Sequence, residues 1–154
     1  MSLTLKEGDK APAFTAKDQN GNTVSLSDYK DKNLILYFYP QDNTPTCTTE
    51  ACNYRDNYQS LLSKGFEVIG VSFDNEKSHK KFEKKFSLPF TLIADPDHKI
   101  IDAYGVWGPK KLFGRDYMGT LRTTFIIDGK GIIKKIIAKV ESKNASQQVL
   151  DALQ

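Results

Sequence analysis

The apolar run Leu34 to Tyr39 (LILYFY) is the feature that most constrains the fold. It shows no polar alternation and stops at Pro40, as expected of a strand that is buried on both faces. Glu67 to Phe73 and Phe90 to Ala94 have the same character and predict two more buried strands. A sheet of such strands needs helices on both faces, so the sequence predicts an α/β fold.

Helical patterns follow these strands in turn. After residue 50, apolar side chains recur at spacings of three and four and predict one helix that ends at Lys64-Gly65. Three further helices are expected: a Lys-rich one from Glu76 to Phe86, a short one between Asp95 and Tyr104, and a last one with Val149, Leu150 and Leu153 facing inward.

Turn signals predict two hairpins. Short alternating segments around 14–17 and 23–26 flank an Asn-Gly pair, and 121–127 and 132–140 flank Asp128 to Gly131. Residues 105–120, which contain several glycines, are expected to form a loop. This order predicts a thioredoxin-like fold in one domain over 1–154: a central mixed β-sheet flanked by helices, with an N-terminal β-hairpin.

Composition narrows the class of protein. The chain has 154 residues, of which 39% are hydrophobic and 27% charged, and its start lacks the apolar core of a signal peptide. We therefore expect a cytoplasmic protein with no membrane contact. The net charge of +3 comes from lysines that are scattered rather than clustered with aromatic residues, so we expect no nucleic-acid binding.

Cys47 is the first candidate for chemistry. Thr44 is a favoured N-cap residue and Pro45 suits the first helical position, which makes Cys47 the third residue of a helix. The positive end of the helix dipole favours thiolate over thiol there, and the thiolate is the nucleophilic form. The alternative is that Cys47 is only a small buried side chain.

Cys52, the second of two cysteines, comes five residues later. In a continuous helix this spacing means a rise of about 7.5 Å and a rotation of about 140°, which prevents a disulfide. If the two cysteines do pair, the first turns of the helix must unwind, which couples oxidation to local unfolding. Otherwise Cys52 is an inert residue on the helix flank.

Arg122 is the candidate cation. It is one of three arginines against nineteen lysines and stands in a run that is otherwise free of charge. A buried guanidinium needs an anionic partner, and the Cys47 thiolate could be that partner. The alternative places Arg122 on the outward face of an edge strand.

These residues carry a family resemblance. Pro40-x-x-x-Thr44-x-x-Cys47 matches the peroxiredoxin active-site motif, and YFYPQDNTPTCTTEAC is similar to the bacterioferritin-comigratory or PrxQ type. GDKAPAF near the start and GTLRTTFIID late in the chain extend the resemblance over nearly the whole chain. One departure is Thr46, where this subfamily usually has glycine.

The resemblance implies a peroxidase that reduces hydrogen peroxide and organic hydroperoxides. Cys47 would be the peroxidatic nucleophile, and Cys52 the resolving thiol of an intramolecular disulfide that thioredoxin or a similar dithiol reduces. Thr44 would offer its hydroxyl to the peroxide, Pro40 would shield the pocket, and Arg122 would stabilise the thiolate. Glu50 matches a position that is often acidic, and its role is left open. The resemblance implies a monomer and no metal or organic cofactor.

Two other readings compete with this one. Cys47, Cys52, His79 and His98 could bind a metal, but their spacing matches no zinc pattern, and both histidines are expected on the surface. Alternatively, the same thiolate could serve a thiol redox sensor or chaperone without turnover. Continuous consumption of hydroperoxide distinguishes an enzyme from such a sensor.

Overall fold

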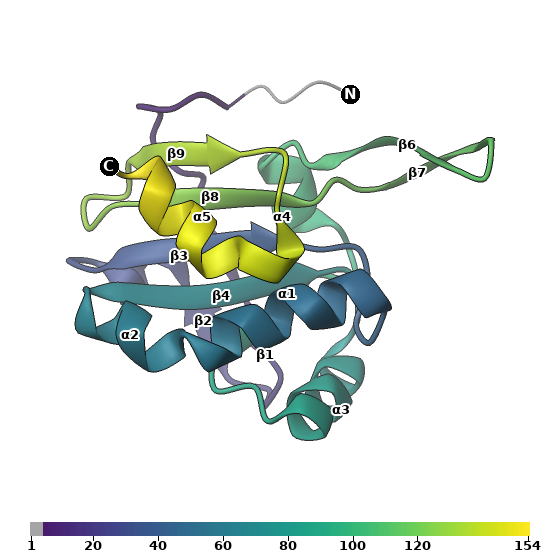
Figure 1. Ribbon diagram of the computed structural model, residues 1–154, viewed down its shortest axis with the longest axis horizontal. Coiled ribbons are helices and arrows are strands. Elements are labelled where there is room, and N and C mark those ends of the chain that lie inside the picture. Colours follow the sequence, from purple (N-terminus) through teal and green to yellow (C-terminus); the bar gives the residue numbers. More distant parts are fainter. Residues whose placement is uncertain (1–4) are drawn as a thin grey trace.

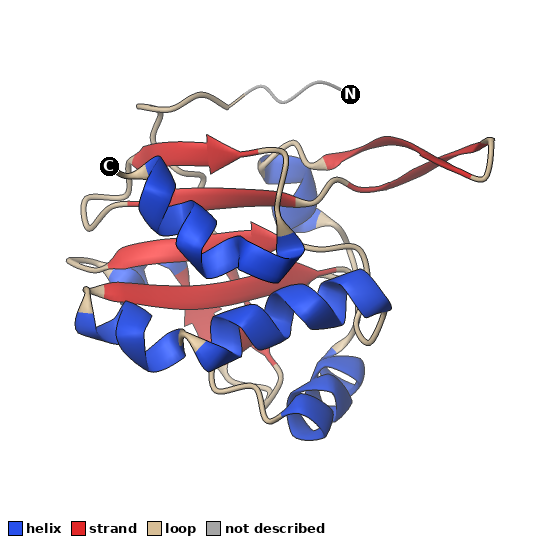
Figure 2. Ribbon diagram, viewed as in Figure 1, coloured by secondary structure: helices blue, strands red, loops and turns tan. Residues whose placement is uncertain are grey.

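The computed structural model describes residues 5–154, apart from the side chain of Leu112. Within this part of the chain, seven strands form one mixed sheet in the order β2-β1-β5-β4-β3-β8-β9 (Figures 1 and 2). Its strands are β1 (Thr15–Asp18), β2 (Thr23–Ser25), β3 (Asn33–Phe38), β4 (Phe66–Ser72), β5 (Thr91–Ala94), β8 (Thr123–Ile127) and β9 (Ile133–Ile137). The helices are α1 (Pro45–Asp56), α2 (Tyr58–Ser63), α3 (Glu76–Phe86), α4 (Lys99–Ala103) and α5 (Ala145–Ala152), with short 3-10 turns at Leu26–Tyr29 and Ser142–Asn144.

β3 lies inside the sheet, parallel to β4 on one side and antiparallel to β8 on the other. Its side chains alternate between two cores. Ile35, Tyr37 and the following Tyr39 pack with residues of α1 and α5, whereas Leu36 and Phe38 pack with residues of α4. The expected strand with two buried faces and the α/β class are therefore confirmed.

Both predicted hairpins are confirmed. β1 pairs with β2 in antiparallel register, and β8 pairs with β9 across the turn at residues 128–131. The position of β8 matters for function, because Thr123 pairs with Phe38. The start of β8 therefore lies beside the end of β3.

The prediction of a loop over residues 105–120 is wrong. β6 (Trp107–Leu112) and β7 (Arg115–Thr120) form a second, two-stranded sheet that projects away from the main one (Figure 1). Its residues are mostly exposed, so neither strand carries the alternation of apolar and polar residues that marks a half-buried strand. Phe113 and Gly114 turn the chain with positive φ angles of 52° and 77°.

Two expectations about helices also need correction. The helix expected to continue to Lys64-Gly65 is divided at Asn57 into α1 and α2, and Leu62 is 37% exposed. α3 has the expected bounds, but His79 on it is fully buried rather than on the surface. His79 shares one face of α3 with the buried Phe82, three residues on, so this spacing indicates that His79 is buried as well.

No helix in the described part of the chain is both long and apolar enough to span a membrane.

The close packing of β4 on β3 gives a test of this core. A Cβ atom added to Gly70 would lie 2.9 Å from the ring and hydroxyl of Tyr37 and 3.0 Å from Leu92. We expect Gly70→Ala to lower the free energy of unfolding by about 1–3 kcal/mol, measured by urea denaturation. The loss of stability should be smaller in a Tyr37→Phe background, because the hydroxyl oxygen, one of the two Tyr37 atoms at 2.9 Å, is then absent. Equal costs in both backgrounds would contradict this packing.

Candidate active site

The candidate site begins where β3 ends. Residues 40–44, here called the substrate loop, connect β3 to α1. Thr44 is the N-cap of α1 in extended conformation, with Pro45 at the first helical position, so Cys47 is the third residue of the helix as expected. The Thr44 side chain does not cap the helix, however. Its hydroxyl donates to the carbonyl oxygen of Gln41 at 3.1 Å.

Arg122 contacts the Cys47 sulfur. Cys47 is 1% exposed, and Arg122 Nη2 donates to its Sγ at 3.2 Å. Arg122 stands just before β8, which is an internal strand beside β3, so the alternative of an outward arginine on an edge strand is wrong. The structure therefore brings the candidate cation to the candidate nucleophile.

Glu50 completes an ion-pair chain with Arg122. It lies three residues after Cys47 on α1, it is fully buried, and its Oε1 accepts from Arg122 Nη1 at 2.8 Å. Glu50 Oε2 is buried with no hydrogen-bond partner. Burial raises the pKa of Glu50 from 4.5 to about 7, against the opposing effect of the Arg122 charge and hydrogen bond. The sequence leaves the role of Glu50 open. Its position one turn after Cys47 on the same helix is the feature that indicates a carboxyl near the sulfur.

The Arg122 guanidinium stays charged in this setting. Burial lowers its pKa, but the charges of Cys47 and Glu50 and the hydrogen bonds to both outweigh burial, so the pKa is raised overall. A second cation, Lys110 of β6, lies nearby. It lines a pocket of about 330 Å³ together with Arg122, and burial and the charge of Arg122 lower its pKa.

Cys52 lies in the same unbroken helix as Cys47, and both are free thiols. Cys52 is partly exposed and lines a surface hollow with its neighbours on α1 and with Lys143. The continuous helix keeps the two sulfurs apart, as the spacing of five residues predicts.

Four of the predicted site residues, Pro40, Thr44, Cys47 and Arg122, therefore lie near one end of β3, whereas Cys52 lies further along α1. The structure joins Cys47 to Arg122 directly and places Thr44 at the N-cap just before them. Pro40 directly follows Tyr39 at the end of the strand, and its shielding role remains a prediction.

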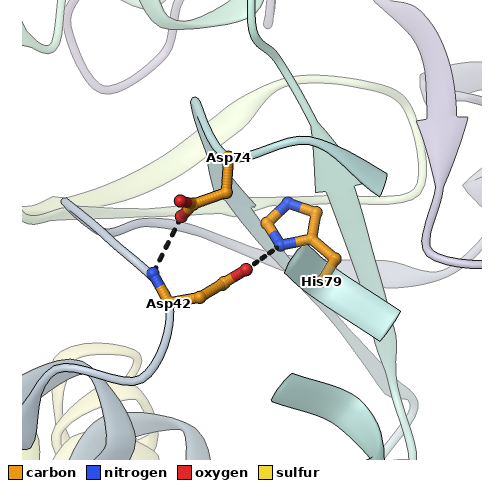
Figure 3. A group of neighbouring side chains, drawn as sticks. All are labelled: Asp42, Asp74 and His79. Atoms are coloured by element: carbon orange, nitrogen blue, oxygen red, sulfur yellow. Dashed lines mark hydrogen bonds and ion pairs between the residues drawn. The ribbon is translucent and has the colours of Figure 1, made fainter. Parts of the chain in front are cut away.

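The four proposed metal ligands do not come together. In the described part of the chain, the group able to hold an ion consists of Asp42, Asp74 and His79, and it includes neither cysteine (Figure 3). His98 lies elsewhere, with its ring 4.4 Å from that of Trp107.

Comparisons with known proteins agree with this geometry. Residues 7–136 match the model of the AhpC/TSA family. The chain is 46% identical to peroxiredoxin Bcp of Bacillus subtilis over 98% of this chain and 96% of the relative. A cysteine-to-serine mutant of Xylella fastidiosa PrxQ superposes with a TM-score of 0.92 at 29% identity, covering 99% of this chain and 97% of the other. A structure of the Xanthomonas campestris bacterioferritin comigratory protein, described for its alkyl peroxide reduction activity, gives 0.85 at 28% identity, with 99% and 97% covered.

The raised pKa of Glu50 predicts a dependence of stability on pH. Between about pH 4.5 and pH 7 the folded protein binds a proton at Glu50 that the unfolded chain has released, so stability falls as pH rises through this range. The loss is about 3 kcal/mol when complete. We expect Glu50→Gln to remove this loss while still accepting from Arg122, as measured by urea denaturation of the reduced protein at pH 5 and pH 8.

The exposed Glu141 provides the control, since Glu141→Gln should keep the pH dependence of the parent protein. If Glu50→Gln and Glu141→Gln lost the same stability between pH 5 and pH 8, the buried carboxyl would not be the titrating group.

Proposed function

Because the chain belongs to the AhpC/TSA family and is a peroxiredoxin, a thiol-dependent peroxidase, we propose that Cys47 is its peroxidatic cysteine and Cys52 its resolving cysteine. The observation that carries this assignment is the contact of 3.2 Å between Arg122 Nη2 and the buried Cys47 Sγ. A sulfur at a helix N-terminus beside a guanidinium favours the thiolate, which the reaction requires.

In the first step the Cys47 thiolate attacks one oxygen of a hydroperoxide. The S–O bond forms as the O–O bond breaks, the sulfur becomes a sulfenic acid, and the leaving oxygen takes a proton and departs as water or an alcohol. Arg122 stabilises the charge on sulfur before the step and on oxygen during it. The Thr44 hydroxyl orients the peroxide, and Pro40 shields the pocket.

The substrates are hydrogen peroxide and organic hydroperoxides. The Xanthomonas campestris relative, which is described for alkyl peroxide reduction, supports the organic part of this range. The pocket shared by Arg122 and Lys110 is lined mainly by apolar residues and has room for an organic group.

In the second step the Cys52 thiol attacks the sulfenic sulfur, a disulfide forms, and water leaves. The helix α1 must unwind for this, because the spacing of the cysteines forbids the bond in the intact helix. A dithiol such as thioredoxin then reduces the disulfide and becomes oxidised itself. The partly exposed position of Cys52 in a surface hollow supports access for such a reductant. We place this cycle in a monomer in the cytoplasm.

Two serine variants test the assigned roles. Cys47→Ser should abolish thioredoxin-coupled consumption of hydrogen peroxide, because no nucleophile remains. Cys52→Ser should still form a sulfenic acid on Cys47 but recycle slowly, since no resolving thiol is available. Coupled steady-state assays and mass spectrometry of the trapped sulfenic acid measure both. Turnover at the parent rate in Cys47→Ser would refute the mechanism.

Unwinding of α1 can be followed by hydrogen exchange. Backbone amides of residues 45–55 should exchange faster after one equivalent of peroxide, because the disulfide breaks the first turns of the helix. In Cys52→Ser, where only the sulfenic acid forms, the increase should be absent. Equal protection before and after disulfide formation would show that α1 does not unwind.

A further inference from the structure

Asp42 fastens the substrate loop to the rest of the molecule. It is 7% exposed, although its neighbours Gln41 and Asn43 face solvent. Asp42 Oδ1 accepts from the Tyr39 hydroxyl at 2.6 Å, and Oδ2 accepts from the Ser78 hydroxyl at 2.8 Å. A buried carboxylate is costly unless its oxygens are satisfied, and the donors around this one satisfy both.

His79 connects Asp42 to the sheet. Its ring is fully buried, with Nδ1 2.7 Å from Asp42 Oδ2 and Nε2 2.9 Å from the carbonyl oxygen of Ile93 on β5. A carbonyl oxygen only accepts, so Nε2 carries a hydrogen, and Nδ1 faces the Asp42 carboxyl. The ring therefore bridges the loop and a strand of the core.

Asp74 holds the backbone of the same loop. Its Oδ2 accepts from the backbone N–H of Asp42 at 2.8 Å and from the hydroxyl of Ser72, the last residue of β4, at 2.6 Å. Figure 3 shows the result, in which Asp74 reaches the main chain of Asp42 while His79 reaches its side chain. Asp42 is thus fixed at two points by residues from outside the loop.

The peroxidase steps give these three residues no chemical part, yet Asp42 lies midway between Pro40 and Thr44. Both Asp42 carboxyl oxygens, both ring nitrogens of His79 and Asp74 Oδ2 have protein partners, so the geometry favours an anchor over an ion site. We propose, building on the proposed function, that Asp42, His79 and Asp74 are positioning residues. They hold the substrate loop in its peroxide-binding geometry while α1 unwinds and rewinds beside it.

The proposal predicts that two reactions of the Cys47 sulfur respond differently when the loop is released. Reduction of a peroxide needs both the thiolate and the ordered loop, whereas alkylation of Cys47 by iodoacetamide needs the thiolate and access to the buried sulfur but not the ordered loop. All measurements use the full chain in a Cys52→Ser background, so that only Cys47 reacts. Quench-flow with mass spectrometry gives the rate constants of both reactions.

Asp42→Ala should slow oxidation of Cys47 by hydrogen peroxide about 10- to 100-fold, the size of effect that a displacement near 1 Å can produce. Alkylation of Cys47 should change by less than about threefold. Asp74→Ala, which removes the acceptor of the Asp42 N–H and of the Ser72 hydroxyl but leaves the Asp42 side chain in place, should show the same split at smaller size. Asp74 is partly exposed, so this variant answers the question if Asp42→Ala does not fold.

Asp42→Asn is the rescue variant. Its amide oxygen can still accept from Tyr39, and its N–H can donate to Nδ1 of an uncharged His79 while Nε2 keeps its bond to Ile93. We expect it to retain most of the peroxide rate. Asp97→Ala, at an exposed aspartate in the loop after β5, should match the parent in both reactions.

Three results would overturn the proposal that these residues position the loop. The first is an unchanged rate of Cys47 oxidation in folded Asp42→Ala or Asp74→Ala, and the second is a slower oxidation that alkylation matches equally. The third is an Asp42→Asn variant that is oxidised as slowly as Asp42→Ala. Failure of the proposed function is distinguishable, because the Cys52→Ser parent would then not form a sulfenic acid on Cys47 at all.

Discussion

The contact between the Arg122 guanidinium and the Cys47 sulfur is the interaction on which the rest of the site depends. It joins residues that are 75 positions apart in sequence. It exists because β8 runs antiparallel to β3, so that the residue before Thr123 lies beside the end of β3. The topology of the sheet thus delivers the cation to the loop and helix that carry the nucleophile. Without this pairing of β8 with β3, the motif around Cys47 would provide a thiol but no neighbouring positive charge.

The helix α1 has two halves of different character. At its start, the Thr44 hydroxyl bonds within the substrate loop instead of capping the helix, so one stabilising contact is missing there. In its second half, the Asn53 side chain donates to the Lys143 carbonyl oxygen and accepts from the Ser146 backbone, both at 2.9 Å. The segment between the anchored Asp42 and the clamped Asn53 contains both cysteines. The opening that the proposed disulfide requires therefore falls between two points at which the chain is held.

Local patterns in the sequence determine much of this structure and leave identifiable gaps. The buried strands, α3 and both predicted hairpins follow from periodicity and turn residues. Cys47 and Thr44 follow from a local motif, whereas Arg122 is predicted from its place in an otherwise uncharged run. No local pattern predicts the β6–β7 hairpin, because its faces are exposed and the strands lack the alternation of apolar and polar residues that marks a half-buried strand. The lysines around His79 suggest an exposed helix, although its spacing of three from Phe82 indicates burial. Its partner Asp42 is 37 residues away, and no local pattern reveals that contact. For the same reason the partner of Glu50 could not be read from its neighbours.

Glu50 explains how Arg122 tolerates the proposed cycle. In the reduced state the guanidinium contacts the Cys47 sulfur and the Glu50 carboxyl, and burial makes the second of these hard to ionise. In the proposed cycle, formation of the disulfide requires α1 to unwind. This carries both Cys47 and Glu50 away from Arg122, since both belong to that helix. Glu50 gains hydration in the process, which offsets part of the lost ion pair. Arg122 is 18% exposed and lines an open pocket, so water can replace its lost partners. In the proposed cycle Glu50 therefore has two parts: it orients the guanidinium while α1 is intact, and it belongs to the segment that must leave Arg122 before the disulfide can form.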